Sequence, residues 1–227
     1  MTRKVVRLTV DHLAQLPGPC PTCLFWELDP VRRARVRPAE VAAEKEAWVS
    51  EVLREWGSCG RVLLVDDAVA GFAVYAPPAF VPGAAGFPTA PVSPDAVLLT
   101  TVYVDPAHAG GGLGRVLVQA MAADLVERGG VVAVEAFGSR GGGRRTCALP
   151  VDFLGGVGFK TQRAHPTTPR MRMDLRSALS WRGEVEAALE RLVGAVRPPQ
   201  RARPSPPTRD SGRTTRVSTR RVGGLSR

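Results

Sequence analysis

Four glycines within five residues, Gly110, Gly111, Gly112 and Gly114, form the part of this sequence whose composition most directly implies chemistry. Glycine has no Cβ atom, so a glycine-rich turn lets a ligand approach the backbone closely. If a helix follows this turn, its first backbone N–H groups lack partners within the helix, and its N-terminus carries partial positive charge. Such a turn binds anions, and phosphate in particular. We therefore expect it to bind a phosphorylated cofactor.

The segments on either side of the glycine turn have the patterns of a strand and a helix. Residues 97–105 are rich in β-branched and aromatic side chains, and Pro106 closes the run. Apolar residues then recur at helical spacing as far as Arg128, where two glycines follow as a stop signal. The alternative is a strand-to-helix corner that binds nothing, but four glycines in one turn are entropically costly without a use.

The glycine spacing excludes two common phosphate-binding motifs. A P-loop requires Gly-x-x-x-x-Gly-Lys-Ser/Thr, and no lysine follows these glycines. A dinucleotide-binding fingerprint requires a glycine or alanine three residues after Gly114, where this chain has Leu117. The turn must therefore serve another cofactor.

The turn resembles the acetyl-CoA turn of the GNAT acetyltransferase superfamily, in particular its actinobacterial-type members. That pattern is Arg/Gln-x-x-Gly-x-Gly/Ala, placed after a strand that ends near a proline. Gly112 and Gly114 occupy the glycine positions, whereas Ala109 stands at the Arg/Gln position as a departure. The Ala109 side chain cannot help to hold a pyrophosphate, although the backbone donors of the turn remain. The resemblance implies acetyl-CoA as co-substrate.

The same resemblance implies where the cofactor lies. In this superfamily acetyl-CoA occupies a wedge between the fourth and fifth strands of a mixed sheet. Backbone groups of the fourth strand pair with the pantetheine, and those of the turn hold the pyrophosphate. The residues implied to bind the cofactor are Val102, Tyr103, Val104, Ala109, Gly110, Gly111, Gly112, Leu113, Gly114 and Arg115.

The resemblance further implies an N-acetyltransferase, in which a substrate amine attacks the thioester directly. A lysine-like amine with a pKa near 10.4 is only about 0.1% neutral at neutral pH, so a base or a water chain must remove a proton. The candidate base is Glu135, which interrupts an apolar run on the expected fifth strand. The alternatives for Glu135 are a buried ion pair and an exposed strand residue. Glu27 and Asp29 are secondary candidates on the acceptor side.

A second family pattern, Asn-x-x-Ala-x-x-Phe-Tyr-x-x-x-Gly-Phe, is only partly present. Its tyrosine lies near the CoA sulfur in many members, but this chain has Leu154 there and Cys147 at the asparagine position. Leucine cannot donate a proton to the departing thiolate. Tyr103, on the cofactor strand, is therefore the catalytic candidate for that step, with Cys147 or a water as alternatives. The structural interpretation of Tyr103 is a packed strand aromatic.

Cys20 and Cys23 form a Cys-x-x-Cys pair in a loop broken by prolines. A zinc site would need two more ligands at a similar spacing, but Cys59 and Cys147 are single and the three histidines show no paired spacing. No metal site is therefore expected. A redox pair of the thioredoxin kind would precede a βαβ pattern, which does not follow here. We interpret both cysteines as structural thiols near the acceptor, with a role in shaping its site as the alternative.

The net charge of +10 arises mainly at the C-terminal end. From Arg197 onward the chain has nine arginines and one aspartate, which contribute +8, so residues 1–196 carry about +2. Residues 197–227 are rich in Pro, Ser, Thr and Arg and lack apolar periodicity, which predicts a disordered basic tail. Such a tail could bind nucleic acid through phosphates without sequence specificity, or be a solvated extension without function.

Further features of the sequence concern the cellular location of the protein. The N-terminus has no signal-peptide pattern, and no apolar stretch approaches the length that crosses a bilayer. Four cysteines without an export signal indicate reduced thiols. We therefore expect a cytoplasmic protein with no membrane contact.

Hydrophobic patterning predicts an α/β chain with a mixed sheet, in the order β-α-β-β-β-α-β-α-β. That order resembles the GNAT fold over about residues 4–176. A further helix at about 177–196 has an apolar stripe that needs the sheet or a second subunit, so a homodimer is one expectation. Residues 77–94, with six prolines, are either a lid over the site or a packed Ω-loop. The expected elements are strands at 4–10, 61–66, 70–75, 97–105, 131–137 and two within 158–175, with helices at 38–56, 113–128 and 150–157.

The sequence therefore predicts one acetyltransferase domain over residues 1–196 and a tail over 197–227. Its predicted function is transfer of an acetyl group from acetyl-CoA to an amine of a small molecule or a protein. The alternative is a catalytically weak acyl-CoA-binding regulatory module, whose basic tail recruits nucleic acid or an acidic partner.

Overall fold

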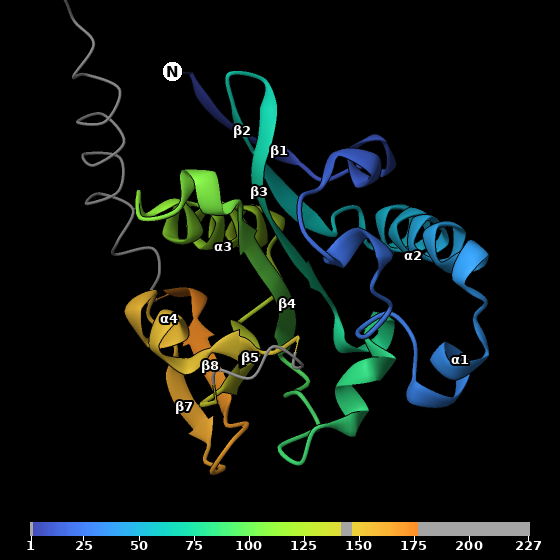
Figure 1. Ribbon diagram of the computed structural model, residues 1–227. Coiled ribbons are helices and arrows are strands. Elements are labelled where there is room, and N and C mark those ends of the chain that lie inside the picture. Colours follow the sequence, from blue (N-terminus) through green and yellow to red (C-terminus); the bar gives the residue numbers. More distant parts are fainter. Residues whose placement is uncertain (1, 142–146, 177–227) are drawn as a thin grey trace, which may run out of the picture. The chain divides into compact units, whose positions relative to one another are not determined.

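The computed structural model describes residues 2–141 and 147–176, all of which fall within one unit, Met1–Ala188 (Figure 1). The helix expected at 177–196 and the tail expected at 197–227 lie outside the described residues.

A mixed sheet forms the centre of this unit. Its strands follow the order β1-β2-β3-β4-β5-β8-β7, and a short β6 also pairs with β5. Neighbours are antiparallel except β4 with β5 and β5 with β6, which are parallel. The strands are β1 (Arg3–Arg7), β2 (Gly60–Val65), β3 (Ala68–Ala76), β4 (Ala96–Val104), β5 (Ala133–Ser139), β6 (Leu149–Pro150), β7 (Lys160–Arg163) and β8 (Arg170–Asp174).

Two layers cover the opposite faces of the sheet. The α3 layer consists of α3 (Leu113–Arg128) and α4 (Val151–Gly156), and Leu117, Met121 and Leu125 of α3 are buried in its core. The α2 layer consists of α2 (Val41–Trp56), α1 (Pro30–Arg35), and residues 8–29 and 77–95. Figure 1 shows α2 and α3 on opposite sides of strands β2 to β4. The expected α/β mixed sheet is thus confirmed.

The ladder between β4 and β5 is short, and this divides the sheet. It comprises the pairs Ala96–Ala133, Val97–Val134 and Leu98–Glu135. Beyond Leu98, β4 continues to Val104 alongside β3, whereas β5 continues alongside β8 and then β6. We call the divergence of β4 and β5 beyond Leu98 and Glu135 the wedge.

A β-bulge lies where β4 leaves β5. Val74 of β3 faces Thr101, and the next residue, Tyr75, faces Leu99, so Thr100 is the extra residue on β4. The Thr100 hydroxyl donates a hydrogen bond of 3.0 Å to the Val74 carbonyl. Because a bulge bends its strand and increases its twist, Thr100 directs the end of β4 away from β5.

Most predicted elements are present near their expected bounds. The helix expected at 113–128 is α3, which follows Gly112 and ends before Gly129, both at positive φ. The helix expected at 38–56 is a short 3-10 turn followed by α2. The first strand ends at Arg7 instead of Val10, because a 3-10 turn begins at Val10. The patterns did not predict α1 or β6.

Residues 77–95 are packed against the sheet. The Trp48 indole N–H donates to the Phe80 carbonyl at 2.7 Å, and the Gly83 N–H donates to the Trp26 carbonyl at 3.1 Å. The Phe87 ring stacks on Phe137 of β5, with 4.2 Å between ring centroids. These contacts match the packed Ω-loop among the two sequence interpretations.

Candidate functional site

The glycine turn between β4 and α3 is open. Gly110 and Gly112 have φ angles of +84° and +72°, which side chains of other residues rarely adopt. A Cβ atom built at either glycine would have no neighbour within 4 Å, and one built at Gly111 would meet only Leu113, at 3.9 Å. A ligand could therefore contact the backbone of all three residues.

Gly114 has a different role from its neighbours. A Cβ atom there would lie 2.9 Å from Cε2 of Phe153, so glycine allows the first turn of α3 to pack against α4. The Arg115 guanidinium also reaches α4, where it donates to the Gly156 carbonyl. These two predicted cofactor residues thus also join the two helices of the α3 layer.

The start of α3 suits a diphosphate. The first bond of the helix runs from the Val116 N–H to the Gly112 carbonyl, and the preceding N–H groups have no partner within a helix by its geometry. The first turn of α3 carries no acidic side chain. Ala109 is exposed beside the turn. The donors available here are backbone N–H groups at a helix N-terminus, and these donors fit a pyrophosphate.

The strand that precedes the turn contributes to both faces of the sheet. Val102 and Val104 pack against the core of the α3 layer, and Tyr103 packs against that of the α2 layer. The Tyr103 ring stacks on Phe72 with 5.7 Å between centroids. It also touches Gly18, where a Cβ atom would lie 2.7 Å from the ring. Tyr103 is therefore held at the open end of the wedge.

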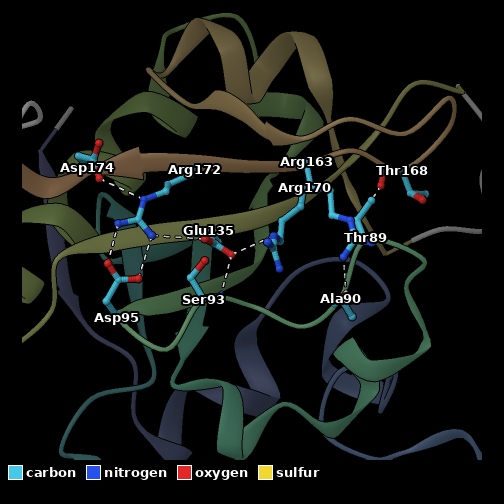
Figure 2. Close-up of polar contacts among 10 residues, drawn as sticks. All are labelled: Thr89, Ala90, Ser93, Asp95, Glu135, Arg163, Thr168, Arg170, Arg172 and Asp174. Carbon is cyan, nitrogen blue, oxygen red and sulfur yellow. Dashed lines mark hydrogen bonds and ion pairs between the residues drawn. The ribbon is translucent and has the colours of Figure 1, made fainter.

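Glu135 lies at the closed end of the wedge and is fully buried. Its Oε2 accepts a hydrogen bond of 3.1 Å from the Ser93 N–H and lies 3.2 Å from Nε of Arg170. Its Oε1 accepts a hydrogen bond of 3.4 Å from Nη1 of Arg172. Figure 2 shows both arginines reaching from β8 toward the carboxylate, with Ser93 on its other side. Of the sequence interpretations of Glu135, this geometry matches the buried ion pair.

Arg172 extends this network to the protein surface. Its guanidinium binds Asp95 in a bidentate pair with distances of 2.9 and 2.8 Å, and its Nε donates to Asp174 at 3.1 Å (Figure 2). These partners, Asp95 above all, raise the pKa of Arg172. In turn, the hydrogen bonds from Arg172 lower the pKa of Asp95. Arg172 thus links the buried Glu135 to two exposed carboxylates.

The two secondary carboxylate candidates also have structural partners. Glu27 is buried, forms an ion pair with Lys45, and accepts a hydrogen bond of 3.2 Å from the Trp26 N–H. Asp29 caps α1 by accepting hydrogen bonds from the backbone N–H groups of Val31 and Arg32. The structure therefore brings Glu135 and Tyr103 to the wedge, and places Glu27 and Asp29 in the packing of the α2 layer.

The cysteine contact differs from the one that spacing suggests. Sγ of Cys23 lies 3.7 Å from Sγ of Cys147, which is 124 residues away. A hydrogen bond from the Cys147 thiol lowers the pKa of Cys23 to about 6, and the same contact raises the pKa of Cys147. Burial raises the pKa of Cys20 to about 11. Within residues 2–141 and 147–176, no group of three or more His, Cys, Asp or Glu residues could hold a metal ion.

Sequence reasoning missed the arginines of β8 and the lysine of α2. Arg170 and Arg172 alternate with Met171 and Met173, a period of two that indicates one charged and one apolar strand face. Since Glu135 interrupts an otherwise apolar strand, the alternation could have suggested its partners. Lys45 lies on the apolar stripe of α2 and is buried against Glu27. Its spacing from Trp48 and Val49 places it on that stripe, so a charged residue there could have suggested a buried partner.

No helix in the described part of the chain is both long and apolar enough to cross a membrane.

Comparison with known proteins is consistent with this geometry. Residues 22–141, more than half of the chain, match the model of the acetyltransferase (GNAT) family. No curated protein matches the chain. An aminoglycoside acetyltransferase solved in complex with coenzyme A is 18% identical, with a TM-score of 0.51, and the match covers 79% of this chain and 98% of that one. An N-acetyltransferase from Staphylococcus aureus Mu50 is 13% identical, with a TM-score of 0.50 and coverage of 77% and 99%.

At such identities the similarity to solved structures concerns the fold, whereas the family match over residues 22–141 spans α2, β4, the glycine turn, α3 and β5. The match therefore includes the turn that fits a pyrophosphate and the strands that form the wedge. The chain belongs to the GNAT acetyltransferase family, as an acyltransferase of the N-acetyltransferase type with acetyl-CoA as its co-substrate.

Proposed function

We propose that the protein transfers an acetyl group from acetyl-CoA to an amine by direct attack of the amine on the thioester. The observation that carries this proposal is the open glycine turn at the start of α3, directly after the strand that diverges from β5. Backbone N–H groups of residues 110–115 would hold the pyrophosphate, because the Ala109 N–H already donates to the Pro106 carbonyl at 3.2 Å. The edge of β4 at Val102, Tyr103 and Val104 would pair with the pantetheine.

In this reaction the amine nitrogen forms a bond to the acetyl carbon, and the carbon–sulfur bond of the thioester breaks. The amine loses one proton to water, and the departing thiolate gains one. We propose Tyr103 as the proton donor, because its ring is held at the open end of the wedge by Phe72 and Gly18. A phenol that donates its proton recovers one from water.

We assign Glu135 a positioning role in place of direct proton transfer. Both of its oxygens already face arginine side chains, so an acceptor amine would have to displace one of these ion pairs to reach it. Held in this way, Glu135 fixes Arg170 and Arg172 beside the closed end of the wedge. The acceptor would approach from the α2 layer, on the face of the sheet that Tyr103 and Glu135 share. We propose an acceptor amine on a small molecule or a protein, and a cytoplasmic location.

The test is calorimetric titration of acetyl-CoA into the full chain, with a thiol-release assay on a panel of small amines and peptides with free N-termini. Gly111 offers a matched pair of variants, because a Cβ atom there would meet only Leu113, at an ordinary contact distance of 3.9 Å. Gly111→Asp adds a negative charge beside the pyrophosphate, and Gly111→Asn adds the same shape without the charge. We expect Asp to weaken acetyl-CoA binding roughly tenfold or more relative to Asn, the scale of a close pair of like charges.

The fold provides an internal control for this comparison. An acidic side chain near a helix N-terminus stabilises the helix, so the Asp variant should be at least as stable as the Asn variant. Equal affinities in the two variants would contradict a pyrophosphate at this turn. Binding of acetyl-CoA without thiol release from any amine would instead favour the second function.

The second function is an acyl-CoA-binding regulatory module. Two departures from the family pattern favour it. Leu154, at the position of the usual tyrosine, is fully buried in the core of the α3 layer, and Ala109 replaces the usual Arg or Gln. In that case the basic tail would recruit nucleic acid or an acidic partner. That binding should weaken steeply with salt and disappear when residues 197–227 are deleted.

A further inference from the structure

One short segment connects the two sides of the wedge on the α2 face. Gly18 touches the ring of Tyr103 on β4, and five residues later the sulfur of Cys23 touches that of Cys147. Cys147 lies two residues before β6, and β6 pairs with the end of β5 at Gly138 and Ser139. We call residues 18–23 the strap. The strap therefore runs from the β4 side to the β5 side at the open end of the wedge.

The contact between the strap and Cys147 is a contact between two thiols. The sulfurs are 3.7 Å apart and half-buried, and a disulfide would require them to approach to about 2.05 Å. The surroundings also favour a thiolate on one of them. The Cys147 thiol is placed to donate to a Cys23 thiolate, and the Lys45 ammonium lies 3.0 Å from the Cys23 carbonyl. Glu27 also faces this pair, and its charge raises the pKa of both thiols. Cys20 raises the pKa of Cys147.

We propose that Cys23 and Cys147 form an oxidation site, in which a peroxide converts the two thiols to a disulfide that ties the strap across the wedge. The Cys23 thiolate attacks a peroxide oxygen, which breaks the O–O bond and gives a sulfenic acid and hydroxide. The Cys147 thiol then attacks the Cys23 sulfur and displaces the sulfenic oxygen as water. In the balance, two thiols and one hydrogen peroxide give one disulfide and two waters.

The consequence for the cofactor rests on the proposed function. The wedge must admit the acyl end of acetyl-CoA between Tyr103 and the β5 side, and a covalent tie restricts the separation of these two sides. The oxidised protein should therefore bind acetyl-CoA more weakly than the reduced protein. If the tie leaves fewer than about one molecule in ten competent to bind, the apparent Kd rises at least roughly tenfold.

The chain supplies its own controls. Cys20 lies on the same strap but has its pKa raised by burial to about 11, and Cys59 is fully buried with its pKa raised by burial to about 12. Neither should react readily with peroxide, because the thiolate is the reactive form. Cys20→Ser and Cys59→Ser should therefore leave the oxidation unchanged, whereas Cys23→Ser or Cys147→Ser should abolish it.

The experiment treats the reduced full chain with hydrogen peroxide, blocks the remaining thiols with a maleimide, and maps linked peptides by mass spectrometry. Because Cys20 and Cys23 share a proteolytic peptide, the map is repeated in Cys20→Ser. The expected result is a Cys23–Cys147 link that dithiothreitol reverses. A Cys20–Cys23 link, a Cys20–Cys147 link or no link would overturn the proposal. If the serine variant does not fold, fragmentation of the linked wild-type peptide between Cys20 and Cys23 assigns the partner of Cys147.

Acetyl-CoA titrations on the reduced, oxidised and re-reduced protein then test the consequence. A rise in Kd on oxidation that reverses with dithiothreitol, and that is absent in Cys147→Ser, supports the tie across the wedge. An unchanged Kd in protein that carries the Cys23–Cys147 link would overturn the proposed effect of the disulfide on acetyl-CoA binding. Failure of the reduced protein to bind acetyl-CoA would refute the proposed function, and with it the effect on the cofactor, while the peptide map would still decide whether the oxidation site exists.

Discussion

The glycine turn and the Glu135 network (Glu135, Arg170, Arg172 and Asp95) differ in the source of their polar groups, which is the backbone in the turn and side chains in the network. The turn offers backbone N–H groups around glycines with open space beside them. The network consists of charged side chains of β5, β8 and Asp95 that neutralise one another, together with the Ser93 N–H, and its Glu135 is fully buried. A site of the first kind depends on local conformation, and one of the second kind depends on strand register. The two sites should therefore respond differently to substitution.

The largest expected effect is on the stability of the network. Glu135→Gln removes the charge that two arginines share, and the Arg170 side chain is only 11% exposed. Breaking a buried ion pair from one side typically costs about 3–5 kcal/mol, because the remaining charge stays buried without compensation. We expect a loss of this size in the free energy of unfolding, measured by urea denaturation.

Asp124 of α3 is the matched control on the other face of the sheet. It is also buried, forms an ion pair with Arg61, and accepts a hydrogen bond of 2.7 Å from the Tyr75 hydroxyl. Asp124→Asn should cost similar stability without changing the KM for the acceptor amine. Glu135→Gln should raise that KM in protein that remains folded. An equal effect of both variants on KM would show that Glu135 positions nothing at the site.

The second-largest expected effect is on kcat, and it should differ between the two tyrosines of the chain, Tyr103 and Tyr75. Tyr103→Phe keeps the ring between Phe72 and Gly18 but removes the proposed proton donor. We expect kcat to fall roughly tenfold with little change in the KM for acetyl-CoA. This effect is smaller than most general acids provide, because a thiol is a fair leaving group. The measurement is the rate of thiol release at saturating acetyl-CoA.

Tyr75→Phe is the corresponding control. It removes a buried hydroxyl that donates to Asp124 and should destabilise the fold by about 1–3 kcal/mol, since Asp124 loses a partner. It should leave kcat unchanged. If Tyr103→Phe also retained full kcat, the thiolate would depart without help from this residue, and Tyr103 would be a packing residue only.

The contrast between the two sites also explains what the sequence could predict. The strand before the turn, the four glycines and the helix to Arg128 are contiguous, so local patterns predicted their structure, and the anion site at the turn stays a prediction. Glu135 was identified as unusual within an apolar strand, but its partner Arg172 depends on the pairing of β5 with β8. The bulge at Thr100 follows from a register shift against β3, and the contact of Cys23 with Cys147 spans 124 residues. The alternation of arginine and methionine in β8 indicates one charged strand face, but no local pattern specifies which distant residue pairs with which.

The third effect is a difference in stability between variants of two glycines that differ in backbone φ angle. Gly112 has a φ angle of +72°, whereas Gly111 has no positive φ, and neither has close neighbours. Gly112→Ala should therefore cost about 1–2 kcal/mol of stability through strain alone. Gly111→Ala should leave stability nearly unchanged, or raise it slightly by restricting the unfolded chain. Equal melting temperatures for the two alanine variants would contradict the left-handed conformation at Gly112.

The smallest effect is a pH dependence at the exposed end of the network. The Arg172 guanidinium lowers the pKa of Asp95 in the folded protein, so near pH 4 the unfolded chain binds more protons at this residue than the folded one. The stability that Asp95 contributes is therefore complete above the ordinary aspartate pKa of about 3.9, and is lost as the pH falls through the lowered value. Because the Asp95 side chain is 45% exposed, this contribution should stay below about 1 kcal/mol.

Asp95→Asn isolates this contribution, because Arg172 keeps Glu135 and Asp174 as partners. Urea denaturation between pH 3 and pH 7 should show the wild type slightly more stable at neutral pH, with the two curves converging in acid. A difference that grows toward acid would mean that Asp95 is more easily protonated in the folded state, and that the bidentate pair with Arg172 does not persist in solution. If the two stability curves converge, the Asp95–Arg172 pair behaves as a solvent-screened surface pair, although the same Arg172 side chain also contacts the buried Glu135.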